Sequence, residues 1–379
     1  YNVFGDEILK KIVNVILILL LIGIFFLNRK LDVNESLISY KGVEYLRAKV
    51  VEVVDETLDY PDNSKPVGVQ KIKAKIFKTG KVVELDNELV NTHSIKVHKG
   101  SNVILIQNQN SGSTDDYYYS VYNYDRSIRI FVIIALFVIF LAVIAGIKGF
   151  KSAIALFVSI YIILFFDVAL LMNGYNNILV TIITVILCAV YSLVVLYGYS
   201  KMTLVNMISI GTSFLIAAIM VKIIGKVLYV SGHNMENVET LILVGKTWGL
   251  RIENLLFSAV SIASLGASMD VSVSISSSLK EIKSLNTDLD SRKLFQSGMN
   301  IGKDIIGTMV NTLVFAFIGS SLVTIMVLIS HGVSFNQLVN SDFFSVEITK
   351  GLIGTVVVII MVPVTSLFSS IIYNLKGEN

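Results

Sequence analysis

The sequence predicts a mainly α, polytopic membrane protein, in which a helical bundle of about eight transmembrane helices carries a small extracytoplasmic all-β domain after the first helix. Three observations lead to this prediction. Hydrophobic residues make up 54% of the 379-residue chain and charged residues only 16%, whereas soluble domains average about 25% charged residues. Apolar runs long enough to cross a bilayer recur along the chain. One long charged segment with strand-like alternation interrupts them.

Composition also narrows the set of partners. The net charge of +3 is small and the basic residues are scattered, so nucleic acid is not an expected partner. The only cysteine, Cys188, lies inside an apolar run, which leaves no disulfide framework or multi-cysteine metal site within one chain. We therefore expect no cofactor and no metal, and the lipid bilayer is the first predicted partner.

The apolar runs define the spans. The first run, Ile12 to Leu27, resembles a signal-peptide core, but Asn28, Arg29 and Lys30 follow it in place of a small-residue cleavage site, so an uncleaved anchor is predicted. The other runs are long enough for about 30 Å of hydrocarbon. They cover residues 130–147, 152–172, 177–197, 203–224, 253–279, 305–330 and 351–373.

Loop charges predict the orientation. With the N-terminus in the cytoplasm, the short outer loops Asn173 to Asn177 and His331 to Glu347 contain no Lys or Arg, as the positive-inside rule requires. The loop around Gly225 to Arg251 departs from the rule, and we expect it to contain a short interfacial helix with Trp248. The predicted inner side carries Lys148, Lys151, Lys201, Lys280, Lys283, Arg292, Lys293, Lys303 and Lys376. Both termini are thus predicted to be cytoplasmic.

Residues 31–127 change character and predict the external domain. Period-two stretches such as Val69 to Phe77 and Ile95 to Gln107 are bounded by turn formers, which indicates four to six short strands in a small β-barrel or sandwich. The tyrosine-rich stretch Asp115 to Tyr124 is expected to form the last strand. Its tyrosines could also line a binding groove, although alternation places half of them in the core. His93 and His98 are expected to be surface residues and not metal ligands.

The stretch GASMDVSVSISSSLKEI, Gly266 to Ile282, alternates like a strand but lies in a predicted span. An isolated strand cannot satisfy its backbone in lipid, so a helix is predicted. On a helix, one face carries Gly266, Asp270, Ser274 and Ser277 or Ser278. With Lys280 at the inner interface, about ten residues at 1.5 Å each place Asp270 roughly 15 Å deep, near mid-membrane.

The next span repeats the theme in SGMNIGKDIIGTMVNTL, Ser297 to Leu313. Spacings of three and four place on one stripe Asn300, Asp304, Gly307 or Thr308, and Asn311. The connecting loop is short, so we expect antiparallel neighbouring helices whose stripes face each other. Asp270 would then lie at the depth of Thr308 and Asn311.

Two interpretations of these stripes compete. A carboxylate at the bilayer centre costs at least about 2.5 to 3.5 kcal/mol, which favours a proton or cation site at Asp270 with relays or ligands on both helices. Alternatively, the Ser, Thr and Asn side chains tie helices together, and Gly266, Gly302 and Gly307 allow close packing. Asp167 receives less weight because its span ends about five residues later. The predicted pathway residues are Asp270, Ser274, Asn300, Asp304, Thr308 and Asn311.

These stretches carry a family resemblance. GASMDVSVSISSSLKEI and FQSGMNIGKDIIGTMVNTL strongly resemble the YibE/F family of bacterial multi-span membrane proteins, and the likeness extends over the whole chain, including KGSNVIL, KGFKSAIAL and GYNNILV. The resemblance implies a bacterial cytoplasmic membrane protein with an anchor, an external domain and a multi-helix block. It implies no assigned activity.

A weaker likeness exists to resistance-nodulation-division permeases and to the SecD and SecF subunits. Those proteins carry an intramembrane Asp, an acidic residue at the helix end and a Thr-rich following span. The similar order in this sequence is Asp270, Val273, Glu281, Gly298, Ile305, Thr308 and Thr312. The number of spans between the external domain and the loop after Asp270 differs, and the external domain is smaller. Fold analogy of this kind does not establish activity.

The sequence thus predicts three parts: residues 1–30 as the cytoplasmic end and anchor, 31–127 as the extracytoplasmic β-domain, and 128–379 as a seven-helix membrane domain. The first functional hypothesis is a transporter or proton-coupled permease for a small solute or ion. The second is a non-transporting scaffold or receptor whose external domain binds a protein partner. Enzymatic activity is not expected, because the sequence contains no nucleophile elbow, phosphate loop or metal-ligand spacing. Small residues such as Gly351 and Gly354 permit a homo-oligomer.

Overall fold

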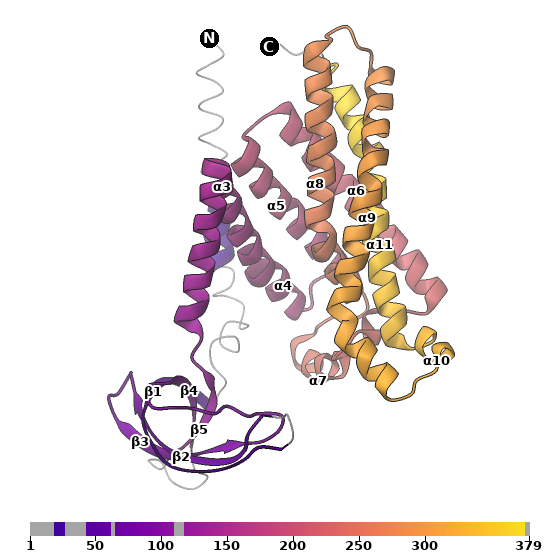
Figure 1. Cartoon of the computed structure of the whole chain (residues 1–379). Helices are drawn as coiled ribbons and strands as arrows, with labels where there is room; N and C mark the ends of the chain where they lie inside the picture. Colours follow the sequence, from indigo (N-terminus) through magenta and orange to yellow (C-terminus); the bar gives the residue numbers. More distant parts are fainter. Residues whose placement is uncertain (1–18, 27–42, 62–64, 110–116, 376–379) are drawn as a thin grey trace. The chain divides into compact units, whose positions relative to one another are not determined.

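The computed structural model describes residues 19–26, 43–61, 65–109 and 117–375 (Figure 1). The chain divides into two compact units. One comprises Asp32–Gly146, and the other comprises Tyr1–Leu31 with Ile147–Asn379. Three predicted features lie wholly or partly outside the described residues. They are the predicted anchor apart from residues 19–26, the first two residues of Asp115–Tyr124, and Lys376.

The first unit contains the predicted all-β domain. Five antiparallel strands form one sheet in the order β3–β2–β1–β4–β5. They are β1 (Val43–Asp59), β2 (Val67–Ile76), β3 (Val82–Leu89), β4 (Asn102–Gln109) and β5 (Tyr117–Tyr124). Alternate side chains are buried along β2 and β3, because successive side chains of a strand point to opposite faces. The buried face packs around Ala48, Ile72, Val103 and Leu105.

One predicted strand begins later than expected. Residues Ile95 to Ser101 are irregular and β4 starts only at Asn102, yet Ile95 and Val97 are buried in the sheet core. Buried amides replace the missing ladder: Asn87 Nδ2 donates to the Ile95 carbonyl (2.8 Å), and the Val97 amide donates to Gln70 Oε1 (2.9 Å). The alternation of residues 95–101 therefore indicates which side chains are buried and not a paired strand. Side-chain amides take the place of a neighbouring strand as hydrogen-bond partners of this backbone.

The last strand and the histidines follow the prediction. Tyr119 packs against the core, whereas Tyr118 and Tyr122 are exposed, as alternation requires. A register shift between the pairs Ile104–Asn123 and Leu105–Val121 interrupts the alternation, and Tyr124 also packs against the core. His93 and His98 both lie on the surface. The ring of Tyr122 meets that of Tyr45 edge to face, with centroids 5.0 Å apart. A tyrosine-lined binding groove stays a prediction.

An ion pair at the end of β5 predicts acid sensitivity of this unit. Burial alone raises the pKa of Asp125, but hydrogen bonds from Arg47 (Nε to Oδ2, 2.7 Å) and Ser127 hold it below its ordinary value. A lowered folded-state pKa contributes stability that is present above the ordinary carboxyl value and is lost as pH falls through the folded value. Because Arg47 is half exposed, we expect a contribution of about 1 kcal/mol or less.

The measurement is hydrogen exchange of β1 and β5 amides in the full chain, corrected for intrinsic pH dependence. At neutral pH, Arg47→Met should lower protection in both strands, and the difference from wild type should vanish once the pH has fallen below the lowered pKa of Asp125. Equal protection of the two proteins at neutral pH would contradict the assignment.

The second unit is helical, and the described residues of the two units together contain six helices long and apolar enough to span a membrane, the first of which begins within the first unit. The first, Ser127–Met172, comprises α3 (Ser127–Ile162), the π-turn η1 (Ile163–Asp167) and α4 (Val168–Met172). Gly146 interrupts α3 with φ 60° and ψ −142°, a conformation that a residue with Cβ rarely adopts. This break separates the runs predicted at 130–147 and 152–172, so the described helices account for seven predicted spans.

The other spans are α5 (Asn177–Tyr197), α6 (Lys201–Leu228), α8 (Leu255–Leu285), α9 (Ser291–Ser330) and α11 (Asp342–Ile372), with short η2 (Gly232–Asn234), α7 (Val238–Trp248) and α10 (Phe335–Val339) between them. Helix α9 begins well before the predicted residue 305, at the N-cap Asp290, whose side chain accepts from the Lys293 amide. Hydropathy marks only the stretch in lipid, whereas capping sets the helix end. The predicted short helix is α7, and the Trp248 side chain lies outside the description.

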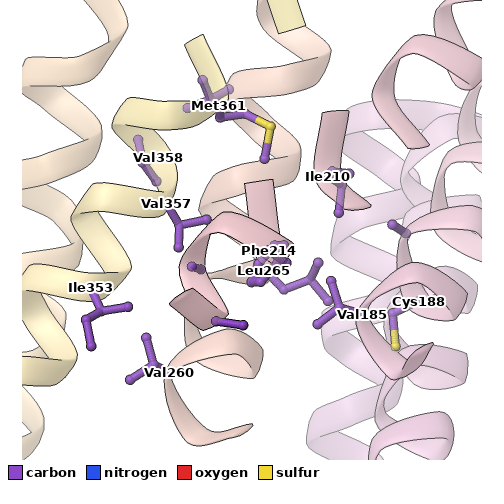
Figure 2. Close-up of a cluster of buried hydrophobic side chains, with 14 of the residues drawn as sticks. Val185, Cys188, Ile210, Phe214, Val260, Leu265, Ile353, Val357, Val358 and Met361 are labelled. Carbon is purple, nitrogen blue, oxygen red and sulfur yellow. The ribbon is translucent and has the colours of Figure 1, made fainter. Parts of the chain in front are cut away.

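Helix α11 lies at the centre, where it contacts α6, α8 and α9. Figure 2 shows the buried apolar side chains between these helices and α5, from Val185 and Cys188 to Phe214, Leu265, Val357 and Met361. Two glycines allow α9 to approach α11: a Cβ at Gly302 would lie 2.1 Å from Val362 Cγ1, and one at Gly298 would lie 2.5 Å from Ser366 Oγ. In contrast, Gly266 and Gly307 have no neighbour within 4 Å of such a Cβ, so the packing role expected of them is wrong.

Candidate functional site

The predicted polar stripes lie on the outer surface of a single chain. Asp270 and Ser274 are exposed on α8. On α9, the exposed set is Asn300, Asp304, Thr308 and Asn311. The expectation that the two stripes face each other is therefore wrong, although a role for these residues in a pathway stays a prediction.

Packing of α9 explains this outcome. Gly298 and Gly302 are buried against Ser366 and Val362 of α11. Successive residues on a helix are about 100° apart, so residues two positions apart lie on nearly opposite faces, about 160° from each other. Asn300 is two positions from each glycine and therefore points away from α11. The Thr308 hydroxyl bonds its own helix at the Ile305 carbonyl (2.9 Å). Close glycine packing thus turned the polar stripe away from the bundle.

The opposite face of α8 carries the buried polar groups. We name as the serine seam its six buried serines, Ser258, Ser261, Ser264, Ser268, Ser272 and Ser276, each at most 2% exposed. Their spacings of three and four place them on one helix face. The sequence-based prediction rested on Asp270 and therefore selected the opposite face of α8. The signal that could have identified the seam is its match with buried polar stripes on α6 and α11, which include Asn206, Ser209, Thr365 and Ser369.

The seam joins three helices at Ser272. The Ser272 hydroxyl donates to Asn206 Oδ1 (2.7 Å), and the Thr365 hydroxyl donates to Ser272 Oγ (3.3 Å). Asn206 Nδ2, Ser209 Oγ and Ser369 Oγ are buried without a hydrogen-bond partner among the described residues. A buried unpaired polar group costs about 1 to 3 kcal/mol. Three such atoms in one interface favour the binding of small hydrogen-bonding molecules such as water between these helices.

A second polar cluster surrounds Asp167, the last residue of η1, which is fully buried. The Thr184 hydroxyl lies 2.8 Å from Asp167 Oδ1 and 3.0 Å from the Val180 carbonyl oxygen of its own helix. Asp167 Oδ2 has no hydrogen-bond partner among the described residues. Single π-turns are rare in helices and are frequent at functional sites. The structure thus buries the carboxylate of Asp167, a residue to which the sequence pattern assigned less weight than to Asp270.

The cluster connects to the serine seam through α5. Thr181, one turn before Thr184, donates from its hydroxyl to Ser258 Oγ (2.7 Å), and both partners are buried. Asn177, one turn earlier, is also buried, and its Oδ1 has no partner among the described residues. Apolar periodicity could not show that Asp167 faces α5, but Asn177, Thr181 and Thr184 at spacings of four and three were a readable signal.

The arrangement around Thr184 can hold Asp167 in two protonation states. When the carboxylate is ionised, the single Thr184 hydroxyl proton points to Oδ1. When the carboxyl is protonated, it can donate to Thr184 Oγ1, and the hydroxyl proton then points to the Val180 carbonyl. Both contacts are within hydrogen-bond distance. Hydroxyl rotation therefore keeps the group partnered whether or not a proton is bound.

We also searched the described residues for a possible metal site. Within the residues described, no three His, Cys, Asp or Glu side chains come together as possible metal ligands. The single cysteine, Cys188, is buried with Sγ 3.8 Å from the Ser159 carbonyl oxygen.

Comparison with known proteins identifies a family for the helical part. The family described as YibE/F-like protein matches residues 133–375, a range that contains α4 to α11 and follows the five strands. No curated protein and no solved structure matches the chain, so the likeness to resistance-nodulation-division permeases stays a prediction. The family match covers most of the sequence and all the polar clusters of the helices, and the chain belongs to the YibE/F-like protein family.

Proposed function

We propose that this chain is a proton-coupled permease of the bacterial cytoplasmic membrane, moving a small solute or ion, and that Asp167 carries the proton. The observation that supports this most directly is the fully buried carboxylate at a π-turn, one oxygen of which has no hydrogen-bond partner in the described part of the chain. A buried ionised carboxylate in a membrane helix costs at least about 2.5 to 3.5 kcal/mol. Binding a proton removes that cost, and Thr184 offers a partner in either state.

The serine seam supports a route away from Asp167. Ser258 accepts from Thr181 beside Asp167, and at the other end the Ser276 carbonyl accepts from the Tyr373 hydroxyl (3.1 Å). The two serines are separated along α8 by roughly 27 Å, at 1.5 Å per residue, close to the thickness of the hydrocarbon core. In this proposal, Asp167 exchanges protons with the external side. The serine seam, with water bound in it, carries protons between Asp167 and the cytoplasm.

The test is the transient current that follows a pH jump on proteoliposomes adsorbed to a solid-supported membrane, because proton binding produces charge displacement without a known solute. Wild type should give a current and Asp167→Asn should lose it. Asp270→Asn is the matched control and should retain it, with thermal unfolding confirming that both variants fold. A current that survives in Asp167→Asn overturns the proposal, and a current lost only in Asp270→Asn returns the proton site to the predicted stripe.

A second candidate function is the receptor or scaffold, and the open side of β1 favours it. Residues Val43–Lys49 of β1 pair with β4, whereas Ala48–Asp59 pair with β2, so the Val51–Asp59 segment has no described strand on its β4 side. A cavity of about 530 Å³ lines this edge, between Glu52–Glu56 and Val97–Lys99. An extended peptide could add there as a strand. Loss of binding to a partner after Val54→Pro, with pH-jump current intact, would select this function.

A further inference from the structure

The outer end of the α6–α8 interface, as the loop charges predict it, contains a cavity of about 460 Å³. It lies between the C-terminal end of α6, the turn that follows and the first residues of α8. The lining residues are Val221, Lys222, Gly225, Lys226, Tyr229, Val230, Ser231, Glu253, Asn254 and Leu256.

Backbone contacts fix the walls of this cavity. Tyr229 ends α6 in the left-handed conformation (φ 55°), and the Val230 amide then donates to the Gly225 carbonyl (2.8 Å). The Gly232 amide donates to the Glu253 carbonyl (3.0 Å), and a Cβ at Gly232 would lie 1.7 Å from the Ile252 carbonyl oxygen. The chain can approach this closely only because position 232 has no side chain. The turn is thus anchored to the start of α8.

Two cationic side chains line the cavity, and both are exposed. Lys222 and Lys226 are four residues apart on α6, which places them on one face. Neither forms an ion pair with any described residue. Glu253 is the one acidic lining residue and also forms no ion pair there. The lining therefore carries a formal excess of one positive charge, together with hydrogen-bond donors on Tyr229, Ser231 and Asn254.

Membrane topology does not account for these lysines. The positive-inside rule predicts few Lys or Arg on the outer side, and the predicted outer loops elsewhere contain none between Asn173 and Asn177 or between His331 and Glu347. An oxyanion can accept hydrogen bonds from both ammonium groups at once.

We infer that this cavity binds an oxyanion of the phosphate type, held between Lys222 and Lys226. The same chemistry can come from a free anion or from the headgroup of an anionic lipid. A free anion at this position would be a solute at the mouth of the helical interface, whereas a headgroup would make the site a lipid anchor. The inference does not depend on proton coupling at Asp167.

The test uses the full chain in nanodiscs of phosphatidylcholine, titrated with inorganic phosphate against chloride at matched ionic strength, with thermal unfolding as the readout. Phosphate should raise the unfolding midpoint of wild type. In the Lys222→Gln/Lys226→Gln double variant, phosphate binding should weaken by about tenfold or more, because each charge-assisted hydrogen bond is worth at least one decade. Lys303→Gln on α9 is the matched control and should bind as wild type does.

A second variant keeps the inference falsifiable if the double variant unfolds. Glu253→Gln removes the competing negative charge and should tighten phosphate binding. A parallel series replaces part of the phosphatidylcholine with phosphatidylglycerol: a lysine-dependent midpoint shift there, without a free-phosphate effect, assigns the site to a lipid headgroup. No lysine-dependent shift in either series, or an equal loss in Lys303→Gln, overturns the inference.

Discussion

Replacing Thr184 by valine is expected to shift the proton concentration at which a pH jump displaces half of its charge about 5- to 150-fold, whereas replacement by serine should leave this concentration close to that of wild type. Valine has nearly the shape of threonine but no hydroxyl, so Asp167 loses its hydrogen bond to Thr184 Oγ1, which is 2.8 Å long. Leaving such a buried acceptor unsatisfied costs about 1 to 3 kcal/mol, the free energy that corresponds to this fold-change.

Serine is the informative control because it keeps the hydroxyl and the bond to the Val180 carbonyl while removing only a methyl group. Thr181→Val is a second control. It breaks the bond to Ser258 without removing the Thr184 partner of Asp167, so it should slow the decay of the current more than it reduces the charge bound. If the displaced charge of Thr184→Val has the same pH dependence as that of wild type, rotation of this hydroxyl is not part of proton binding.

Replacing Gly302 by alanine is expected to destabilise the helical unit by about 1 to 3 kcal/mol, as overpacking in a close-packed core generally does. The added Cβ would lie 2.1 Å from Val362 Cγ1 and 2.9 Å from Val362 Cγ2, so α9 must separate from α11 or Val362 must move. Thermal unfolding in detergent measures the effect.

Gly307→Ala is the matched control on the same helix. Its Cβ would meet no atom within 4 Å, and alanine favours a helix over glycine by up to about 1 kcal/mol, so stability should be unchanged or higher. Combining Gly302→Ala with Val362→Ala should restore part of the loss, because the two side chains compete for one space. Equal destabilisation by Gly302→Ala and Gly307→Ala would contradict the packing of α9 on α11.

Sequence alone determined the class of this protein and the extent of most of its elements. Hydrophobicity and period are local properties of the chain, so the apolar runs located α5, α6, α8 and α11, the alternation of Val69 to Phe77 located β2, and the tyrosine-rich stretch located β5. Its errors occurred where a side chain replaced a regular partner. The amides of Gln70 and Asn87 hold residues 95–98 outside any strand, and the Asp290 cap starts α9 early.

Only the tertiary structure decided which polar face is buried. Both faces of α8 carry polar residues at helical spacing, and the sequence favoured the face with Asp270. Packing decided otherwise, because Gly298 and Gly302 permit a contact with α11 that turns Asn300 and Asp304 outward. In the same way, Asp167 became the buried carboxylate through contact with Thr184, a residue of another helix. Burial of a polar group depends on which helices meet, and periodicity within one helix does not contain that information.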